Sequence, residues 1–596
     1  MQVYEAPIRD MLFNINELHE DDGFGELEGF EDFDDDLTAA ILEEANKFCR
    51  DVLLPINWSG DQEGCRIENG VVRTPKGFQE AYNQFRDGGW TSLVSNPKYG
   101  GQGAPHSLAK MVEEMTCSAN LSFGLYPGLT TGASIALEGY GSEDLKDFYM
   151  PRLVSGEWSG TMCLTEPHCG TDLGMLRTKA EPQDDGSYRV TGNKIFISAG
   201  DHDLTENVIH LVLARLPDAP PGVKGISLIL VPKYLPNDDG SLGDYNNVKA
   251  TAIEHKMGLK ASATCQMSFD ESKGWLVGEK HRGLEAMFLM MNTERVAVGI
   301  QGLGVGEIAY QSAVYYAKDR VQGRSLSGVK NPDGPADPII VHPDVRRMLM
   351  TMRAYNEGSR AVSAWVSRAL DAEHAAKEPE ARQRAADFVA LMTPVVKALF
   401  TDLGHDSAHL AVQVYGGHGY IQETGVEQFA RDARIAQIYE GTNGIQALDL
   451  VGRKLPHKMG RNLRAFFHPV SNFIEDNTSD ADIGPMVIAL QQSFGALQLS
   501  TGHIAQKGMK DPEEAGAAAT DYLKLLGFVA MGYTFAKAAQ VAHRKLKEGT
   551  DEESFYKSKI ITAQYFFDRL LPPATAAFMA IKAGKKSMME LPAEAF

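Results

Sequence analysis

The sequence predicts a helical domain, a β domain, a second helical bundle and an extra C-terminal helical domain, in that order. The chain has 596 residues, which is too long for a single hydrophobic core and should divide into three or four domains. Its apolar residues follow a helical period at first, switch to short strand-like segments near Gly160, and return to the helical period after Gly283.

An acidic N-terminal segment, residues 1–36, comes before the first helical domain. We expect the run from Glu20 to Asp36 to be solvated and mobile, because its like charges repel one another. The stretch LTAAILEEANKFCRDVL then opens an amphipathic helix that ends before Pro55. The N-terminal helical domain is predicted over residues 37–160.

Residues 161–282 are predicted to form a central antiparallel β domain. Its apolar segments are short, β-branched and bounded by Gly, Pro, Asp or Asn: TMCLTEP, SYRVTGNKIFISAG, VIHLVLARL, GISLILVPK and CQMSFDE. They follow one another too closely for helices to lie between them.

The helical period covers residues 283–455 and, after a linker expected around Pro456 and Pro469, residues 470–596. This C-terminal extension is predicted to carry three long amphipathic helices. One of them, PEEAGAAATDYLKLLGFVAMGYTFAKAAQVAHRKL, is rich in apolar side chains. We expect these to form a packed core in preference to a membrane contact.

Composition excludes several classes of protein. The net charge of −21 argues against a nucleic-acid partner, since phosphate binding needs a surplus of Lys and Arg. The absence of an uninterrupted apolar run of about 18 residues predicts no membrane span, and the start of the chain lacks the pattern of a secretory signal. Six isolated cysteines suggest neither disulfides nor a metal site. A cytoplasmic protein is expected.

Two motifs of the β domain carry hydroxyls close to turns. In the first, the strand Met162–Thr165 runs into a turn that contains Pro167, Gly170 and Thr171, and such a turn presents a hydroxyl and backbone N–H groups. In the second, Phe196 and Ser198 alternate on one strand and should share a face. Taken singly, the first motif is typical of a polar β-turn and the second of a strand end.

Two further motifs lie in the second helical bundle. A helical segment from Arg431 runs into Tyr439-Glu440-Gly441-Thr442, where the glycine frees the backbone and Thr442 can cap a helix. A carboxylate drawn out of water there would become more basic. In the segment Gln413–Tyr420, glycines allow a backbone to approach phosphate or sugar, and His418 is expected to be a packed or hydrogen-bonding side chain.

These four motifs, in this order, resemble the acyl-CoA dehydrogenase family over about residues 40–455. The resemblance implies an FAD cofactor and an acyl-CoA substrate. Residues matching flavin-side contacts are Thr165, Thr171, Phe196 and Ser198, and those matching the pyrophosphate and adenosine side are Arg320, Gln413, Gly416, Gly417, Thr442 and Gly444. Substrate contacts are expected from Arg295, Thr171, Tyr439 and Gly441, and no metal is implied. Tyr126 and Leu129 are further candidates for the acyl pocket.

The resemblance also implies a mechanism and partners. Glu440 would abstract the α proton of the thioester while the flavin N5 takes the β hydride, and an electron-transfer flavoprotein would accept the electrons. Some members use a base at the position of Glu294, but the Tyr-Glu-Gly-Thr frame favours Glu440, and two ionised carboxylates in one dry site would repel. Some cofactor contacts would come from a neighbouring subunit, which implies a homodimer or homotetramer.

The extension, the N-terminal Tyr4-Glu5-Ala6-Pro7 and the Arg320–Arg324 stretch look most like the 3-methylmercaptopropionyl-CoA dehydrogenases, a branch that acts in dimethylsulfoniopropionate degradation. The expected substrate is 3-methylthiopropanoyl-CoA or another short or medium acyl-CoA. Alternatives are a long-chain fatty acyl-CoA dehydrogenase of β-oxidation and an acyl-CoA oxidase. A non-enzymatic FAD-binding scaffold or a nucleic-acid-associated paralogue is the remaining alternative.

Overall fold

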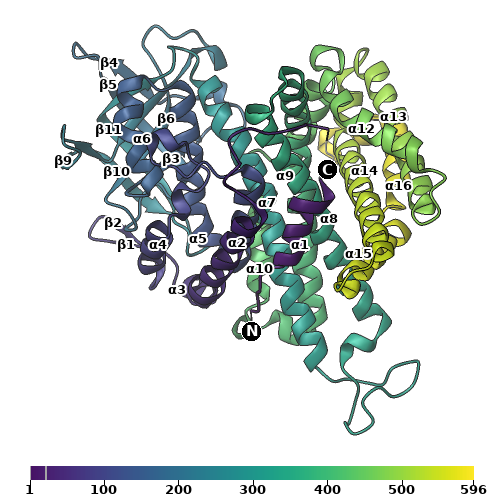
Figure 1. Ribbon diagram of the computed structural model, residues 1–596. Coiled ribbons are helices and arrows are strands. Elements are labelled where there is room, and N and C mark those ends of the chain that lie inside the picture. The colour runs from purple at the N-terminus through teal and green to yellow at the C-terminus, as the bar shows by residue number, and fades with distance from the viewer. Residues whose placement is uncertain (1, 20–22) are drawn as a thin grey trace. The chain divides into compact units, whose positions relative to one another are not determined.

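The computed structural model describes residues 2–19 and 23–596 (Figure 1). Its contacts cluster into two compact units. Unit 1 comprises residues 1–44, 105–118 and 298–596, and unit 2 comprises residues 45–104 and 119–297. Three of the boundaries fall inside the helices Asp35–Phe48, His106–Tyr140 and Gly283–Asp319, so each of these helices belongs partly to both units.

The α-helices are α1 Ile8–Leu12, α2 Asp35–Phe48, α3 Asn57–Glu63, α4 Phe78–Asp87, α5 His106–Tyr140, α6 Glu143–Ser155, α7 Gly283–Asp319, α8 Pro343–Ala375, α9 Pro379–Tyr415, α10 Glu427–Ala436, α11 Asn443–Asp449, α12 Arg461–Asn477, α13 Gly484–Gly508, α14 Pro512–Glu548, α15 Glu553–Tyr565, α16 Pro573–Ala583 and α17 Lys586–Met589. The strands are β1 Arg66–Glu68, β2 Val71–Arg73, β3 Trp158–Cys163, β4 Lys179–Pro182, β5 Tyr188–Ser198, β6 Asn207–Arg215, β7 Ile226–Pro232, β8 Tyr234–Pro236, β9 Leu242–Tyr245, β10 Val248–Ile253 and β11 Thr264–Val277.

Unit 2 contains the predicted β domain (Figure 1). Its seven-stranded sheet has the order β10-β11-β5-β4-β6-β3, with β7 pairing with both β11 and β6. The sheet is mixed. Most neighbours are antiparallel as predicted, but β6 has two parallel neighbours: β3, from Trp158–Asn207 to Cys163–Val212, and β4, at Lys179–Arg215. The sequence predicted only antiparallel pairing because periodicity reports which residues lie in strands and not which strands become neighbours.

The sheet has a continuous apolar core. Every residue of β7 is buried, and β6 is buried up to its last residue, and both strands are mainly apolar, with Asn207, His210 and Ser227 as buried polar residues. In β5 buried and exposed residues alternate over its first half, which indicates that only one of its faces packs against the core.

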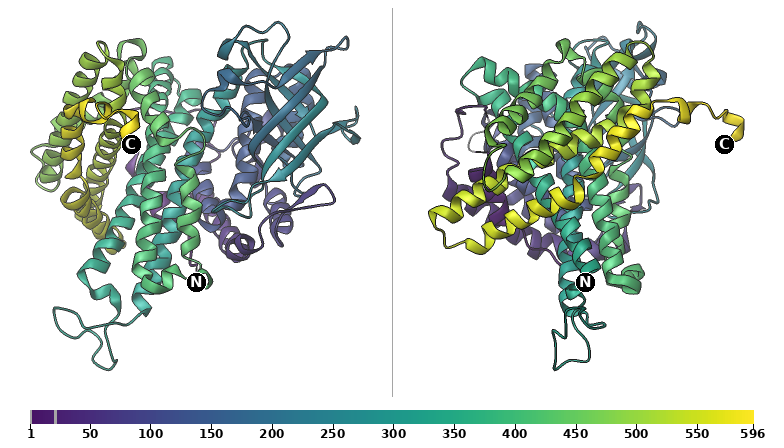
Figure 2. Two further views of the ribbon diagram at one scale, coloured as in Figure 1. Left: turned by 180° about the vertical axis from the view of Figure 1, so that it is seen from behind. Right: turned by 90° about the vertical axis from the view of Figure 1, so that its right-hand side faces the viewer.

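In unit 1 the C-terminal extension packs on the long helices α8 and α9 (Figure 2). The indole of Trp365 on α8 is 2% exposed and contacts three rings, with centroid distances of 4.4 Å to Phe388 on α9, 5.9 Å to Phe466 on α12 and 4.9 Å to Tyr533 on α14. This aromatic cluster joins the extension to the preceding bundle in one core.

The extension differs from the sequence prediction at its start. Pro469 lies inside α12 and does not mark a linker, whereas Pro456 does fall between helices. One described helix, α14, is long and apolar enough to cross a membrane, but 83% of its most apolar window is buried inside the protein. Its apolar residues therefore form a packed core, as predicted.

The start of the N-terminal segment is packed, whereas the acidic run that follows it is largely solvated, as predicted: among its described residues, 23–36, only Phe24 is buried. Tyr4, Met11 and Phe13 are almost completely buried in unit 1. Residues 20–22 of the acidic run lie outside the described residues, but beyond them Phe24 is buried against Phe388 at a ring distance of 6.1 Å. Phe24 stands alone among exposed residues of the acidic run, so the charge pattern did not indicate its burial.

A buried cluster of charges ties this N-terminal segment to the rest of unit 1. The guanidinium of Arg360 on α8 lies 2.5 Å from Asp10 on α1, 2.5 Å from Glu114 on α5 and 2.9 Å from Glu307 on α7. Lys559 on the extension helix α15 forms a second ion pair with Asp10. Burial raises the pKa of Glu114 to about 7, although Arg360 opposes that shift.

Replacing Arg360 with methionine should lower the stability of unit 1 by about 3–5 kcal/mol, because buried carboxylates lose their counter-charge. The loss should be larger at about pH 8 than at about pH 5.5. A carboxyl whose pKa in the folded state is raised to about 7 binds its proton below that pH and then needs no cation, whereas it is ionised above it.

Urea unfolding at the two pH values measures this difference. The control is Arg282→Met, which removes an exposed arginine paired with Glu279 and Glu285 and should cost at most about 1 kcal/mol. Equal losses for the two variants, or a loss for Arg360→Met that does not depend on pH, would contradict the structural role of the cluster.

Candidate active site

The candidate site in unit 1 begins where helices α7 and α9 touch through their backbones. A Cβ atom added at Gly302 of α7 would lie 2.5 Å from the carbonyl oxygen of Phe400, and one added at Gly404 of α9 would overlap the carbonyl oxygen of Gly302. A Cβ atom added at Gly299 of α7 would likewise lie 2.5 Å from the side chain of Val396 and 2.9 Å from its carbonyl oxygen. These glycines belong to a helix packing contact, so Gly302-Leu303-Gly304-Val305-Gly306 is not a dinucleotide-binding motif.

The segment that carries Glu440 connects α10 to α11. Glu440 has a φ of +56° and Gly441 a φ of +82°, so two consecutive residues are left-handed. This conformation is unstrained for glycine but costs on the order of 1 kcal/mol or more for a glutamate. Thr442 caps α11 as predicted: its hydroxyl oxygen accepts a hydrogen bond of 3.3 Å from the backbone N–H of Ile445.

Side chains from α9 and α11 fix this segment. Lys397 donates to the carbonyl oxygen of Gly441 at 2.8 Å and to the side-chain oxygen of Asn443 at 2.8 Å. The amide of Asn443 donates to Asp402 at 2.8 Å, and Gln446 donates to the carbonyl oxygen of Glu440 at 3.0 Å. Gly441 and Asn443 are thereby held to α9, and Glu440 is held to α11.

Tyr439 is held from the other side. Its hydroxyl donates a short hydrogen bond to the side-chain oxygen of Gln301, which lies beside Gly302 on α7. Tyr439 and Glu440 are both partly buried, while Ile438 is exposed. Glu440 therefore projects from a backbone whose conformation is fixed, and the residue is only partly exposed to solvent.

The flavin-side candidates lie in unit 2, where β5 passes the end of β3. The backbone N–H of Ile195 donates to the carbonyl oxygen of Thr165 at 2.9 Å, which places Thr165 directly beside Phe196 in the structure. Gly170 lies against the Thr165 side chain, so Thr171 follows in the same turn. The structure thus gathers the two β-domain motifs into one place.

Phe196 has an unusual conformation for a strand residue. Its φ is +58° and its side chain is 60% exposed, at an irregularity in the register between β5 and β11. Ile197 is buried and Ser198 is partly buried, so Phe196 and Ser198 share the less buried side, as their spacing predicts. A left-handed, exposed aromatic residue is a feature that packing alone would not select.

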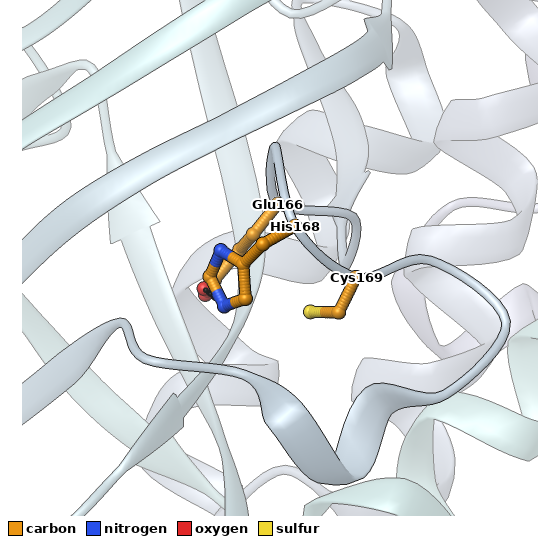
Figure 3. Close-up of side chains that lie close together, drawn as sticks. All are labelled: Glu166, His168 and Cys169. Carbon is orange, nitrogen blue, oxygen red and sulfur yellow. Dashed lines mark ion pairs between the residues drawn. The ribbon is translucent and has the colours of Figure 1, made fainter.

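The turn after Thr165 brings Glu166, His168 and Cys169 together, and their possible ligand atoms lie within 4.8 Å of one another (Figure 3). However, Glu166 is already satisfied. It accepts hydrogen bonds from Lys194 at 2.9 Å, from the Thr178 hydroxyl at 2.6 Å and from the backbone N–H of Arg177 at 2.8 Å. The Lys194 ammonium is the counter-charge of this carboxylate, and the mutual backbone hydrogen bonds of Glu166 and Cys169 close the turn.

The candidates for phosphate and adenosine contacts lie at one end of α7 and α9. Arg320 directly follows α7, and Gly416 and Gly417 directly follow α9; all three are exposed, as is Gln413. Two stacked rings, Tyr316 and Tyr415, join these helix ends at a centroid distance of 4.1 Å. The Tyr316 hydroxyl lies 2.9 Å from Nδ1 of His418, so this histidine is a hydrogen-bonding side chain, as expected.

Thr442 and Gly444 lie at the start of α11, whose segment contacts a different part of α9. Their segment is attached at Lys397–Asp402, eleven residues before Gln413, which corresponds to about 16 Å along the helix. Within one chain, the structure therefore does not bring all the predicted pyrophosphate and adenosine contacts together.

The remaining predicted residues lie in unit 2. Glu294 and Arg295 on α7 are 6% and 7% exposed, and the Glu294 carboxylate packs directly against Gly132 of α5. Tyr126 is fully buried, where its hydroxyl donates to the carbonyl oxygen of Ala261 and accepts from the N–H of Ala263. Leu129 is 8% exposed on the same helix.

Comparison with known proteins identifies the class. Family models match almost the whole chain: acyl-CoA dehydrogenase N-terminal domain at residues 36–157, middle domain at 161–272, C-terminal domain at 281–455, and an acetyl-CoA dehydrogenase C-terminal-like domain at 466–592. The chain belongs to the acyl-CoA dehydrogenase family, whose members are FAD-dependent oxidoreductases.

Individual relatives cover the full length. A 3-methylmercaptopropionyl-CoA dehydrogenase of Ruegeria pomeroyi is 43% identical over 96% of this chain and 97% of its own. A butyryl-CoA dehydrogenase of Syntrophomonas wolfei is 35% identical over 100% and 99%. An acyl-CoA dehydrogenase of Bacillus anthracis, solved in complex with FAD, has the same fold, with a TM-score of 0.73 at 20% identity over 93% and 88%.

Sequence reasoning missed the residues that hold the Glu440 segment, namely Gln301, Lys397, Asp402 and Asn443. One signal was available for Lys397, because it stands alone in the apolar run from Thr393 to Phe400. A single charge on the buried face of a helix requires a partner, and the structure supplies the Gly441 carbonyl and the Asn443 amide.

The backbone contact of α7 and α9 predicts a large effect for Gly404→Ala. The new methyl group would overlap the Gly302 carbonyl, so the helices must separate, at a cost of about 1–3 kcal/mol. The control is Gly495→Ala on α13, where nothing lies within 4 Å of the added atom and helix propensity should raise stability by up to about 1 kcal/mol. Thermal unfolding midpoints compare the two, and equal shifts would disprove the tight crossing.

Proposed function

We propose that this chain removes the α proton of a short or medium acyl-CoA thioester with Glu440, in an FAD-dependent α,β-dehydrogenation that yields the trans-2-enoyl-CoA. The family membership supports the reaction class. The observation that carries the assignment to Glu440 is its left-handed backbone, with a φ of +56°, held by hydrogen bonds from Lys397 and Gln446 to the carbonyl oxygens of Gly441 and Glu440.

A left-handed glutamate fixed on both sides supports a role in catalysis. Non-glycine residues adopt this conformation at some energetic cost, and they keep it where the surroundings enforce it. A general base must lie next to the proton of one particular carbon atom, and a fixed backbone limits the positions that its carboxylate can occupy.

Glu294 is the alternative base. It is 6% exposed and its carboxylate packs against Gly132, on α7, a regular helix, with no backbone strain. Two buried carboxylates that served one substrate would repel one another. We therefore assign Glu440 as the base and Glu294 as a structural residue beside Arg295.

The residues present fit FAD. The exposed ring of Phe196 offers a face for a planar ring system, and the hydroxyls of Thr165, Thr171 and Ser198 offer hydrogen bonds around it. On unit 1, the exposed guanidinium of Arg320 and the open backbone at Gly416 and Gly417 suit a pyrophosphate, because nothing lies within 4 Å of a Cβ added at either glycine. When bound, FAD supplies the acceptor for the β hydride.

This chain's own residues then have defined roles. Glu440 takes up the α proton on its carboxylate, and Lys397, Asn443 and Gln446 keep the backbone that carries it in place. Tyr439 and Gly441 flank the base and are proposed to contact the acyl group, and Arg295 is proposed to hold the CoA moiety.

The substrate proposal rests on the relatives. The 43% identical relative is named for 3-methylmercaptopropionyl-CoA and the 35% identical relative for butyryl-CoA, and both act on short acyl groups by those names. We propose 3-methylthiopropanoyl-CoA or a short or medium acyl-CoA as the substrate of this chain. A long-chain fatty acyl-CoA is the alternative.

The partners follow from the same proposal. A homodimer or homotetramer is supported by the separation of about 16 Å along α9 between Gln413 and the attachment of the Thr442 segment, which suits cofactor contacts made with two different copies. An electron-transfer flavoprotein is proposed as the electron acceptor, as the family resemblance implies.

Replacement of Glu440 by glutamine should leave FAD bound and lower turnover on the order of a thousandfold, because the amide is isosteric but accepts no proton. Flavin absorbance measures cofactor content, and anaerobic bleaching by the substrate measures the reaction. The matched variant is Glu294→Gln, which should keep at least about a tenth of the wild-type rate. Loss of activity in Glu294→Gln with normal activity in Glu440→Gln would reverse the assignment.

A panel of thioesters tests the substrate class. With a dye acceptor, kcat/KM should be at least about tenfold higher for 3-methylthiopropanoyl-CoA and butyryl-CoA than for palmitoyl-CoA, since a pocket shaped for a short chain excludes a long one. A preference for palmitoyl-CoA would establish the long-chain alternative. Stoichiometric hydrogen peroxide without the dye would identify an oxidase instead.

A further inference from the structure

Lys397 is a buried lysine whose ammonium group contacts the segment that carries the proposed base. It is 0% exposed on α9, in the turn next to Val396 and the α7 contact. Its Nζ donates 2.8 Å hydrogen bonds to the Gly441 carbonyl and to Oδ1 of Asn443. Burying an ammonium group is expensive unless its hydrogen bonds are satisfied, so its position in a packed helix needs an explanation.

The position of these hydrogen bonds in the chain supplies the explanation. Gly441 follows Glu440 directly, and both residues are left-handed. The peptide between Gly441 and Thr442 carries the carbonyl that Lys397 binds, so the ammonium fixes the orientation of the backbone immediately after the base. A neutral donor would bind that carbonyl more weakly, because hydrogen bonds from an ionised donor are about twice as strong.

Lys397 also organises the second attachment. The same ammonium orients the side chain of Asn443, whose amide then donates to the Ala398 carbonyl at 3.2 Å and to Asp402 at 2.8 Å. Asp402 in turn accepts from Gln437 at 2.7 Å, on the other side of Glu440. The network of this buried lysine thus connects the chain before the base to the chain after it, across about one and a half turns of α9.

We propose that Lys397 is a positioning residue for Glu440: it keeps the base in its left-handed conformation and so sets the rate of proton removal without contacting the substrate. This inference rests on the proposed role of Glu440. It predicts that loss of the ammonium lowers kcat far more than it changes KM. The surface that binds the substrate remains, and only the orientation of the Glu440 carboxylate is lost.

The test compares Lys397→Met with Lys559→Met in the full-length FAD-loaded enzyme. Both variants remove a buried lysine of unit 1, but Lys559 pairs with Asp10 and Glu357 and has no bond to residues 437–446. Lys397→Met should retain FAD and a KM for butyryl-CoA within about threefold, and lose about a hundredfold or more in the rate of flavin bleaching. Lys559→Met should lower the thermal midpoint and leave that bleaching rate within about twofold.

Hydrogen exchange gives a readout that does not depend on activity. In Lys397→Met, the amides of residues 437–446 should exchange faster while those of the β domain remain unchanged, and Lys559→Met should show neither effect in that segment. If Lys397→Met does not fold, Lys397→Gln is measured instead. Its shorter neutral amide can remain buried but should reproduce the loss of kcat.

The outcomes separate this inference from the assignment of the base. Glu440→Gln without turnover, together with Lys397→Met or Lys397→Gln at a wild-type rate and with wild-type exchange at residues 437–446, would overturn the positioning role and leave Glu440 as the base. An active Glu440→Gln would overturn the base assignment itself. If kcat, FAD content and the thermal midpoint all fell in both lysine variants, Lys397 would be a purely structural residue. That result would also overturn the proposal.

Discussion

The backbone contact between α7 and α9 is the constraint on which the candidate site depends. Gly302 and Gly404 allow the two helices to meet without intervening side chains, and a methyl group at either position would collide with backbone atoms. Because of this contact, Gln301 of α7 and Lys397 of α9 approach the same short segment from two sides. The strained conformation of Glu440 is supported by a rigid pair of helices and not by a flexible loop.

Unit 1 uses buried charge in two different ways. The cluster around Arg360 joins helices α1, α5 and α7 to α8, and Lys559 extends it to α15 in the C-terminal extension, so it consolidates the core. Lys397 instead donates to a backbone carbonyl and a side-chain amide, beside residues whose conformation it controls. The first arrangement neutralises carboxylates, and the second fixes geometry. This difference explains why the two lysines, equally buried, are expected to affect different measurements.

Much of the site could be predicted from the sequence because its residues lie in short, local motifs. The turn after Glu440, the cap at Thr442 and the shared side of Phe196 and Ser198 all depend on neighbours within a few residues. The alternation of helix and strand likewise follows from local periodicity, which is why the order helix, sheet, helix, helix was predicted. The alternation of burial in β5 shows the same local origin.

What escaped prediction depends on contacts between distant segments. The parallel pairing of β3 with β6, the burial of Phe13 and Phe24 and the attachment of Asn443 to α9 each join residues that periodicity treats separately. Pro469 was predicted to lie in a linker because proline usually interrupts a helix, yet α12 continues through it. The positive φ of Phe196 occurs at an irregularity in the register between β5 and β11, which no local sequence pattern predicts.

The most direct test of the central claim measures proton removal separately from oxidation. A thioester with acidic α protons but no transferable β hydride, incubated with the FAD-loaded enzyme in deuterated water, reports α-proton exchange by NMR. The wild-type enzyme should exchange these protons, and Glu440→Gln should slow the exchange on the order of a thousandfold while the ligand still binds. Undiminished exchange in Glu440→Gln would show that another group is the base and would contradict the account.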